Sequence, residues 1–301
     1  DDGANGEGAI SLAANNESTY TISSGAELSK KLLDERLCDA SGSAIFELVN
    51  DIECNQEIRF EQTDDNPINI TLNLNGHKIK CLNTDKPLFD VANGATLTIK
   101  DEIKDSAPVT ETVNDVQQLT DQGQKLSPDN YGKKAVLNYV DGIPSNLTYY
   151  VTKSTPSGTG TIETLVSHNV DIKGAIVACG GNANLKLINL YNNNGKGGTF
   201  NLVSGVITQK QGGSVSSLVY AENGSTVNMS GGYVCGASSL RAGGGIEICN
   251  NSSLNVSGGV IAGNSAYSGG GVHANASTVT ITNGVISGNS TLAVSYTHLR
   301  A

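Results

Sequence analysis

The chain has 301 residues, of which 36 are glycine and 38% are hydrophobic, with no tryptophan and a single methionine. The formal net charge is −10 and no basic stripe could bind phosphates, which argues against nucleic-acid binding. Charged residues make up 16% of the chain, which is too few for an acidic disordered tail. No apolar run approaches the ~20 residues of a membrane helix, so no membrane insertion is expected of this stretch. Frequent glycine and an aliphatic core favour short β-strands joined by tight turns.

At the N-terminus we predict a flexible segment over residues 1–20 and a helical cap over 21–44. The chain begins without an initiator Met, which fits a processed or excerpted segment. Ser24-Gly-Ala-Glu27 forms a capping box, and the helix that it opens carries one apolar stripe, made of Leu28, Leu32, Leu33 and Leu37. Stacked strands leave an unpaired edge at their end, so we expect this helix to cover that edge; an ordinary surface helix is the alternative.

Residues 45–100 are predicted to form the first coils of a solenoid. Two segments that alternate apolar and polar residues begin at Ile70 and Leu97, 27 residues apart. Such alternation is typical of strands with one buried face. The pair Phe89 and Val91 lies eight residues before the second segment, an offset that recurs in the later repeats.

Between residues 101 and 167 the repeat lapses into polar, proline-containing sequence. An interruption of this length is too long for a structureless loop in a compact fold. Residues 135–140 and 147–151 are apolar runs on either side of Asp141-Gly142, which predicts a β-hairpin. We expect this excursion to project from the stack as a contact element.

The main repeat occupies residues 168–293. Four segments read apolar-x-apolar-x-x-Gly-apolar-apolar, and their first residues, separated by 27, 27 and 25 positions, are Phe200, Val227, Leu254 and Val279. Three short strands per ~26 residues make one coil of a parallel β-helix, with coils stacked at about 4.8 Å. The leucine-rich-repeat signature is absent and propeller blades are longer. The pattern therefore predicts that Leu254 lies directly between Val227 and Val279 on adjacent coils.

Residues 294–301 break the repeat without a turn. They resemble the in-frame translation of a sequencing adapter, so His298 and Arg300 are left out of functional reasoning. This predicts a metagenomic fragment of a reading frame that continues in the natural protein. It also predicts that the last coil is an uncapped edge and that the expressed fragment aggregates.

The six cysteines form no C-x-x-C pair, which makes a zinc site improbable; they are Cys38, Cys54, Cys81, Cys179, Cys235 and Cys249. Two interpretations stay open: small buried hydrophobic residues, or disulfides of an exported protein with fifteen possible full pairings.

The segment 261–272, IAGNSAYSGGGV, resembles the G-N-x-A-x-x-G-G unit of adhesin-like right-handed parallel β-helix proteins. This group belongs to the pectate-lyase-like superfamily and includes polymorphic outer-membrane proteins and surface proteins of gut bacteria. Residues 70–79 and 94–101 are similar to the opening coils of the same proteins. The resemblance covers residues 45–100 and 170–290 and implies an all-β, single-stranded right-handed parallel β-helix on a bacterial cell surface, secreted or attached to the wall.

Because polysaccharide lyases and hydrolases share this architecture, we searched for catalytic groups. From residue 170 to 292 the carboxylates are Asp171, Glu222 and Glu247. The repeat places Glu222 and Glu247 roughly 8 Å apart, within the range of inverting glycosidases, but nothing in the sequence predicts a raised pKa for either. Polygalacturonase motifs and a calcium site of clustered aspartates are missing. We therefore expect no catalytic residue, metal or cofactor.

One outward column has sugar-binding chemistry. Tyr220, Glu247 and His273 fall at equivalent positions of successive coils, so an aromatic ring, an acid and an imidazole form a ladder. The alternative is a solvated face whose residues are neighbours through periodicity alone. The predicted ligand-binding residues are Tyr220, Glu222, Glu247, His273 and Asn275, with Cys249 beside them.

Several asparagines lie in glycosylation sequons, among them Asn228, Asn255 and Asn275. We favour a structural role, because asparagine tolerates left-handed turns and stacked asparagines can hydrogen-bond between coils.

These patterns predict an extracellular, non-catalytic adhesin or stalk fragment whose lateral faces bind glycans or surface proteins. The alternatives are a carbohydrate-active β-helix with its site mostly outside this stretch, and a passive spacer.

Overall fold

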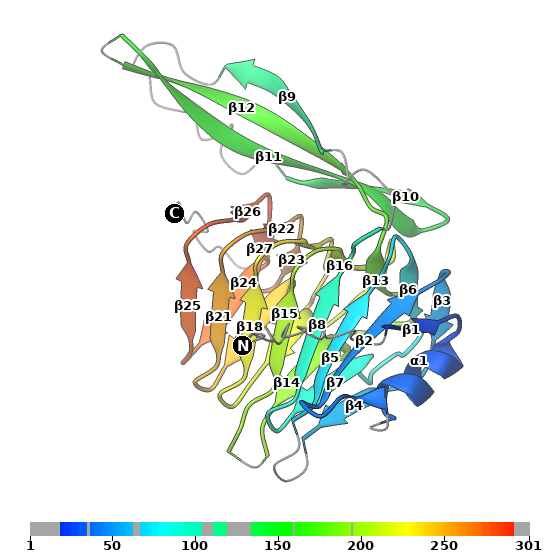
Figure 1. The fold of residues 1–301 in the computed structure, drawn as a ribbon. Coiled ribbons are helices and arrows are strands. Elements are labelled where there is room, and N and C mark those ends of the chain that lie inside the picture. The colour runs from blue at the N-terminus through cyan, green and yellow to red at the C-terminus, as the bar shows by residue number, and fades with distance from the viewer. Residues whose placement is uncertain are drawn as a thin grey trace, which may run out of the picture.

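The computed structural model describes residues 19–34, 37–62, 67–103, 111–118 (backbone only), 134–158, 160–193 and 195–291. Over these residues the chain winds into a stack of coils bounded by three parallel sheets (Figure 1). The fold is a parallel β-helix, as the repeat predicted.

Each coil contributes one strand to each sheet in turn. Sheet A consists of β1 (Thr19–Ile22), β2 (Ser43–Leu48), β5 (Asn69–Asn73), β8 (Thr96–Lys100), β15 (Thr199–Leu202), β18 (Thr226–Met229), β21 (Ser253–Val256) and β25 (Thr278–Ile281). Sheet B consists of β3 (Ile52–Cys54), β6 (Lys78–Cys81), β13 (Ala175–Ala178), β16 (Val206–Gln209), β19 (Tyr233–Cys235), β22 (Val260–Ala262) and β26 (Val285–Ser287). Sheet C consists of β4 (Ile58–Glu61), β7 (Phe89–Ala92), β14 (Lys186–Tyr191), β17 (Ser217–Ala221), β20 (Ile246–Cys249) and β24 (Val272–Asn275). A fourth, two-stranded pairing joins β23 (Ser265–Ala266) to β27 (Ser290–Thr291).

The register confirms the predicted spacing. Leu254 pairs with Val227 on one side and with Val279 on the other. The weaker early repeat is in register as well, because Leu97 of β8 pairs directly with Phe200 of β15 although the excursion separates them in sequence.

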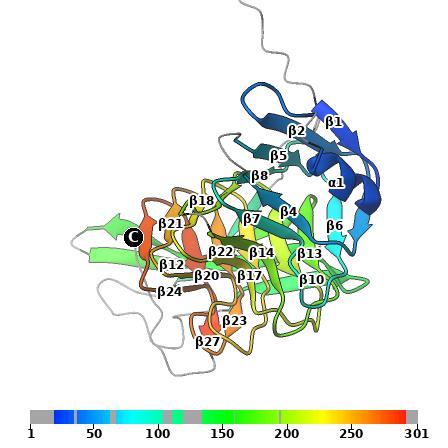
Figure 2. The same ribbon diagram turned by 90° about the horizontal axis from the view of Figure 1, so that it is seen from below.

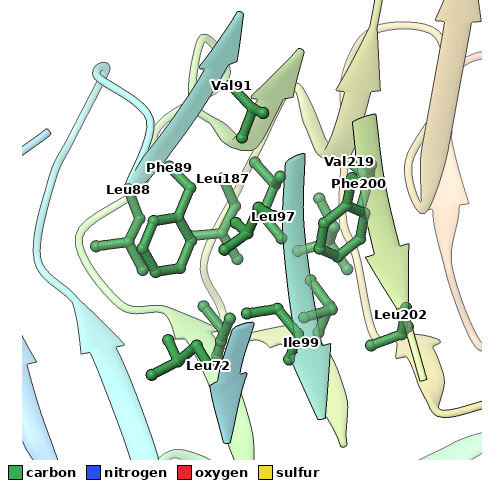
Figure 3. Packing of buried hydrophobic residues seen from close by; sticks show 14 of the residues in the cluster. Leu72, Leu88, Phe89, Val91, Leu97, Ile99, Leu187, Phe200, Leu202 and Val219 are labelled. Atoms are coloured by element: carbon green, nitrogen blue, oxygen red, sulfur yellow. The ribbon is translucent and has the colours of Figure 1, made fainter. Parts of the chain in front are cut away.

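The interior is a set of aliphatic and phenylalanine ladders. Leu72, Ile99 and Leu202 stack on successive coils of sheet A, each at most 1% exposed (Figure 3). Burying side chains of this size stabilises the fold by about 1.5–3 kcal/mol each. Since every inward residue packs between its equivalents above and below, the stack is stabilised by nearest-neighbour contacts.

Helix α1 (Gly25–Leu32) covers the β1 end of the stack (Figures 1 and 2). The Oγ of Ser24 accepts a hydrogen bond from the backbone N–H of Glu27, and Leu28 and Leu32 are buried in the core. The capping helix is thus confirmed. The predicted stripe was wrong at Leu33, which is 47% exposed because it terminates the helix and points away from the strands.

The excursion forms a four-stranded antiparallel sheet of β10 (Val136–Val140), β11 (Ile143–Ser157), β12 (Gly160–Asp171) and β9 (Glu111–Gln118). The predicted hairpin joins β10 to β11 through Asp141 and Gly142, both with positive φ. The base of this sheet packs on the outer face of sheet B and makes a second core that includes Leu147, Tyr149, Val177 and Val206. The distal parts of β11 and β12 extend beyond the coils (Figure 1).

Cys54, Cys81, Cys179, Cys235 and Cys249 are free thiols, and Cys54, Cys81 and Cys235 are buried. Among the described residues, no helix is long and apolar enough to cross a membrane.

Candidate functional site: the outer face of sheet C

Six outward-facing side chains follow one another along sheet C. Their strands pair in register, so one residue per coil falls on the same line. We call this line the sheet C column; it consists of Arg59, Asp90, Asn189, Tyr220, Glu247 and His273. Adjacent members are one coil, about 4.8 Å, apart. The predicted alignment of Tyr220, Glu247 and His273 is therefore confirmed.

Tyr220 is the centre of the upper half of the column. Its hydroxyl donates to Oε2 of Glu222 at 3.0 Å and lies 3.2 Å from the Sγ of Cys249. The Nζ of Lys186 lies 3.3 Å from the ring centroid, a cation–π contact that occupies one face of the ring. A sugar stacking on Tyr220 would therefore have only the other face.

Glu247, half-buried on the next coil, has an unusual pKa. Burial raises it to about 7, and the nearby Glu222 carboxylate adds to the shift, while Lys186 and Arg241 oppose it. Nothing in the sequence had predicted this raised pKa, because it depends on burial in the folded chain. The carboxyl group can hold a proton near neutral pH, which makes it a hydrogen-bond donor as well as an acceptor.

Two cations flank Glu247 from different elements. Lys186 comes from the start of β14, and burial lowers its pKa against the attraction of Glu222 and Glu247. Arg241 comes from the loop before β20, where one of its terminal nitrogens donates to Oδ1 of Asn184 at 2.8 Å. Lys186 is partly buried beside the acid, whereas Arg241 is exposed and is held by its hydrogen bond to Asn184.

The lower half of the column contains an ion pair in which the acid, Asp90, is buried and the base, Arg59, is half-exposed. Asp90 is 2% exposed, and its Oδ2 accepts from the Nε of Arg59 at 3.0 Å and from a terminal nitrogen of the same guanidinium at 2.9 Å. Its Oδ1 accepts from Nδ2 of Asn189 at 2.6 Å. Burial raises the pKa of Asp90, and these hydrogen bonds and the guanidinium charge counteract it.

Two buried polar atoms beside this ion pair have no hydrogen-bond partner among the residues that the structure describes: Oδ1 of Asn189 and the hydroxyl of Tyr191. The Tyr191 ring lies 5.5 Å from the guanidinium carbon of Arg59. One atom is an acceptor and the other can donate, so a water or a ligand hydroxyl could satisfy either.

The structure brings together three of the five predicted ligand-binding residues, Tyr220, Glu222 and Glu247. His273 is the register neighbour of Glu247, and Asn275 is exposed in register with Cys249. Sequence reasoning missed Asp90, Asn189 and Arg59. Asp90 could have been found from the sequence. The offset that aligns Phe89 with the later repeats gives Asp90 the same repeat position as Glu247.

No group of three or more His, Cys, Asp or Glu side chains that could hold a metal occurs in the described part of the chain. A cavity of about 610 Å³ lies at the α1 end, lined by Lys30, Glu57 and Lys86 among others, away from the upper half of the column. The chemistry of the sheet C face is that of a row of hydrogen-bonding and charged groups on a rigid support.

Fold and site together define a parallel β-helix with a row of polar and charged side chains along sheet C. No protein-family model, curated protein or solved structure matches the chain.

Proposed function

We propose that this chain is a non-catalytic binding rod of an extracellular bacterial surface adhesin or stalk, which contacts glycans or surface proteins through the sheet C face. The observation that carries the proposal is the cluster around Tyr220, in which the ring, Glu222 and Lys186 are fixed by mutual contacts. Such preorganisation reduces the entropy lost on binding.

Support also comes from the form of the molecule. A stack of coils with a continuous apolar interior is stiff, and it presents its lateral faces along its whole length (Figure 1). Protonated Glu247 can donate and Glu222 can accept, which suits the hydroxyl groups of sugars.

A glycan and surface-protein array tests the proposal. We expect saturable binding by the unmodified chain and at least tenfold weaker binding by a Glu222→Gln, Glu247→Gln double variant. Glu53→Gln, which removes an exposed carboxylate on sheet B, is the matched control and should bind normally. Equal binding by all three proteins would refute the role of the sheet C face, and binding by none would leave the passive spacer as the better description.

A second candidate, a carbohydrate-active enzyme, is favoured by the raised pKa of Glu247 beside a second carboxylate, the combination that a general acid requires. The assay is release of reducing ends from pectin and mucin glycans. Product release that Glu247→Gln abolishes would favour this candidate over the adhesin; binding without product would exclude it for those substrates.

A further inference from the structure

The upper part of sheet A has an outer surface without charge. It is formed by the outward side chains of β15, β18, β21 and β25 and by the turns that border these strands. The corresponding segments, 197–206, 223–233, 250–261 and 275–287, contain no Asp, Glu, Lys, Arg or His. We call this surface the neutral face. In a chain with a net charge of −10, it is a region where another negatively charged copy meets no like charge.

The neutral face is also regular. One column of side chains on it consists of Thr199, Thr226, Ser253 and Thr278, and the next consists of Asn201, Asn228, Asn255 and Thr280. The strands are parallel and in register, so equivalent groups recur at about 4.8 Å along the stack. All of these side chains are half-buried or exposed.

The asparagines of the neutral face form a ladder. Nδ2 of Asn255 donates to Oδ1 of Asn228 at 2.9 Å, Nδ2 of Asn228 donates to Oδ1 of Asn201 at 2.9 Å, and Asn201 donates to Oγ1 of Thr98 at 3.0 Å. Asn228 thus uses one of its two N–H groups and one of its two acceptor sites within the ladder. The remaining donor and acceptor are available to a partner, and the ladder already holds the side chain in place.

We propose that the neutral face is a self-association surface whose partner is the neutral face of a second copy of this chain. A two-fold interface requires a patch that is complementary to itself. Two identical faces have the same period, and their hydroxyl and amide groups both donate and accept. In-register parallel sheets with uncharged side chains and asparagine ladders pair face to face in this manner.

The other two sides of the stack are less suited to this contact. The excursion packs on the outer face of sheet B through Leu147 and Tyr149, and the part of that face outside the contact carries the charged pair Glu53 and Lys80. The sheet C face carries Glu222 and Glu247 together with Lys186 and Arg241, so pairing two such faces would desolvate charges. Of the three sides, the neutral face is exposed and is the one on which a second copy can approach with the fewest charges to desolvate.

The expected association is weak. Four rungs and four-residue strands give a contact of roughly 20 Å by 15 Å per copy, well below the ~800 Å² that each partner buries in a stable interface. We therefore expect a reversible dimer that becomes populated as protein concentration rises. Attachment of many copies to one surface would strengthen such contacts through multivalency.

Sedimentation equilibrium over a range of protein concentrations tests the proposal. Unmodified protein should show a monomer–dimer equilibrium, and Thr226→Glu, which places a carboxylate at the middle of the face, should weaken it at least tenfold. Thr226→Lys should do the same, whereas an equimolar mixture of the Glu and Lys variants should associate at least as well as the unmodified protein. Val140→Glu adds the same charge at a 62% exposed position of the excursion and should have no effect.

Circular dichroism must show that each variant is folded, and Thr278→Glu, at an exposed position of the same column, repeats the test if Thr226→Glu does not fold. A monomer at every concentration would overturn the proposal. So would association that Thr226→Glu leaves unchanged, because the contact would then use another surface such as the last coil. The Glu222→Gln, Glu247→Gln variant should dimerise normally, which separates this proposal from glycan binding by sheet C.

Discussion

Sheets A and C are built from the same repeat and share one interior, yet their outer faces differ in kind. On sheet A the upper rungs carry threonine, serine and asparagine, and the asparagines bond to one another along the stack. On sheet C the rungs carry Asp90, the neutral ring of Tyr220 and Glu247; Arg59 pairs with Asp90, Lys186 lies over the Tyr220 ring, and Lys186 and Arg241 lie near Glu247. The inward pattern therefore determines the coil, while the outward positions are free to make different surfaces.

The strongest test of the shared interior is Leu254→Ala. Leu254 is fully buried between Val227 and Val279, so the substitution leaves a cavity and should lower the free energy of unfolding by about 2–5 kcal/mol. Urea unfolding followed by circular dichroism measures the change. Both faces should lose their ligand or partner together; a loss confined to one face would show that the two sheets unfold separately.

The next largest effect is expected on sheet C from Asp90→Ala. It removes an acceptor of two bonds from Arg59, which keeps Glu57 as a second partner, and the acceptor of the part-buried Nδ2 of Asn189. We expect a loss of about 2–3 kcal/mol in the free energy of unfolding. Glu53→Gln, at an exposed ion pair with Lys80, should change stability by less than about 1 kcal/mol. Equal effects of the two substitutions would contradict the account of a buried acid.

Glu247 should make stability depend on pH. Its folded pKa of about 7 lies above the ordinary value of 4.5, so on raising the pH the folded state keeps the proton to a higher pH than the unfolded state does. The stabilisation is fully present below about pH 4.5 and is lost as pH rises to about 7. Relative to Glu247→Gln, the unmodified protein should lose roughly 1–2 kcal/mol between pH 4.5 and 7.5, after allowance for partial exposure. Parallel pH profiles for the two proteins would contradict the shift.

The smallest expected effect is that of Asn228→Ala on the sheet A ladder. It removes one donor and one acceptor on a half-exposed surface, so the expected loss is about 1 kcal/mol. Asn275→Ala is the control, since Asn275 is exposed outside this ladder. Identical unfolding midpoints for Asn228→Ala and the unmodified protein would show that the asparagine ladder does not contribute to the free energy of unfolding.

Much of the fold followed from the sequence because inward positions recur with a fixed spacing. Leu97, Phe200 and Leu254 are alike since each must fill the same place in a coil. The alignment of Tyr220 with Glu247 followed from the same spacing. Lys186 did not, because its approach to Tyr220 depends on where β14 begins beyond a turn, and no repeat position predicts it.

By itself, the sequence determined the period of the coil, the inward and outward sides of its strands, and the helix that covers its first end, because these depend on local alternation and capping. Only the tertiary structure decided that the excursion packs on sheet B and that Glu247 lies among Lys186, Arg241 and Glu222. Both depend on contacts between residues far apart in the chain, where the position of a turn or the length of a side chain sets distance and burial. The physical reason is that periodicity specifies which residues stack, but not what folds back over the stack.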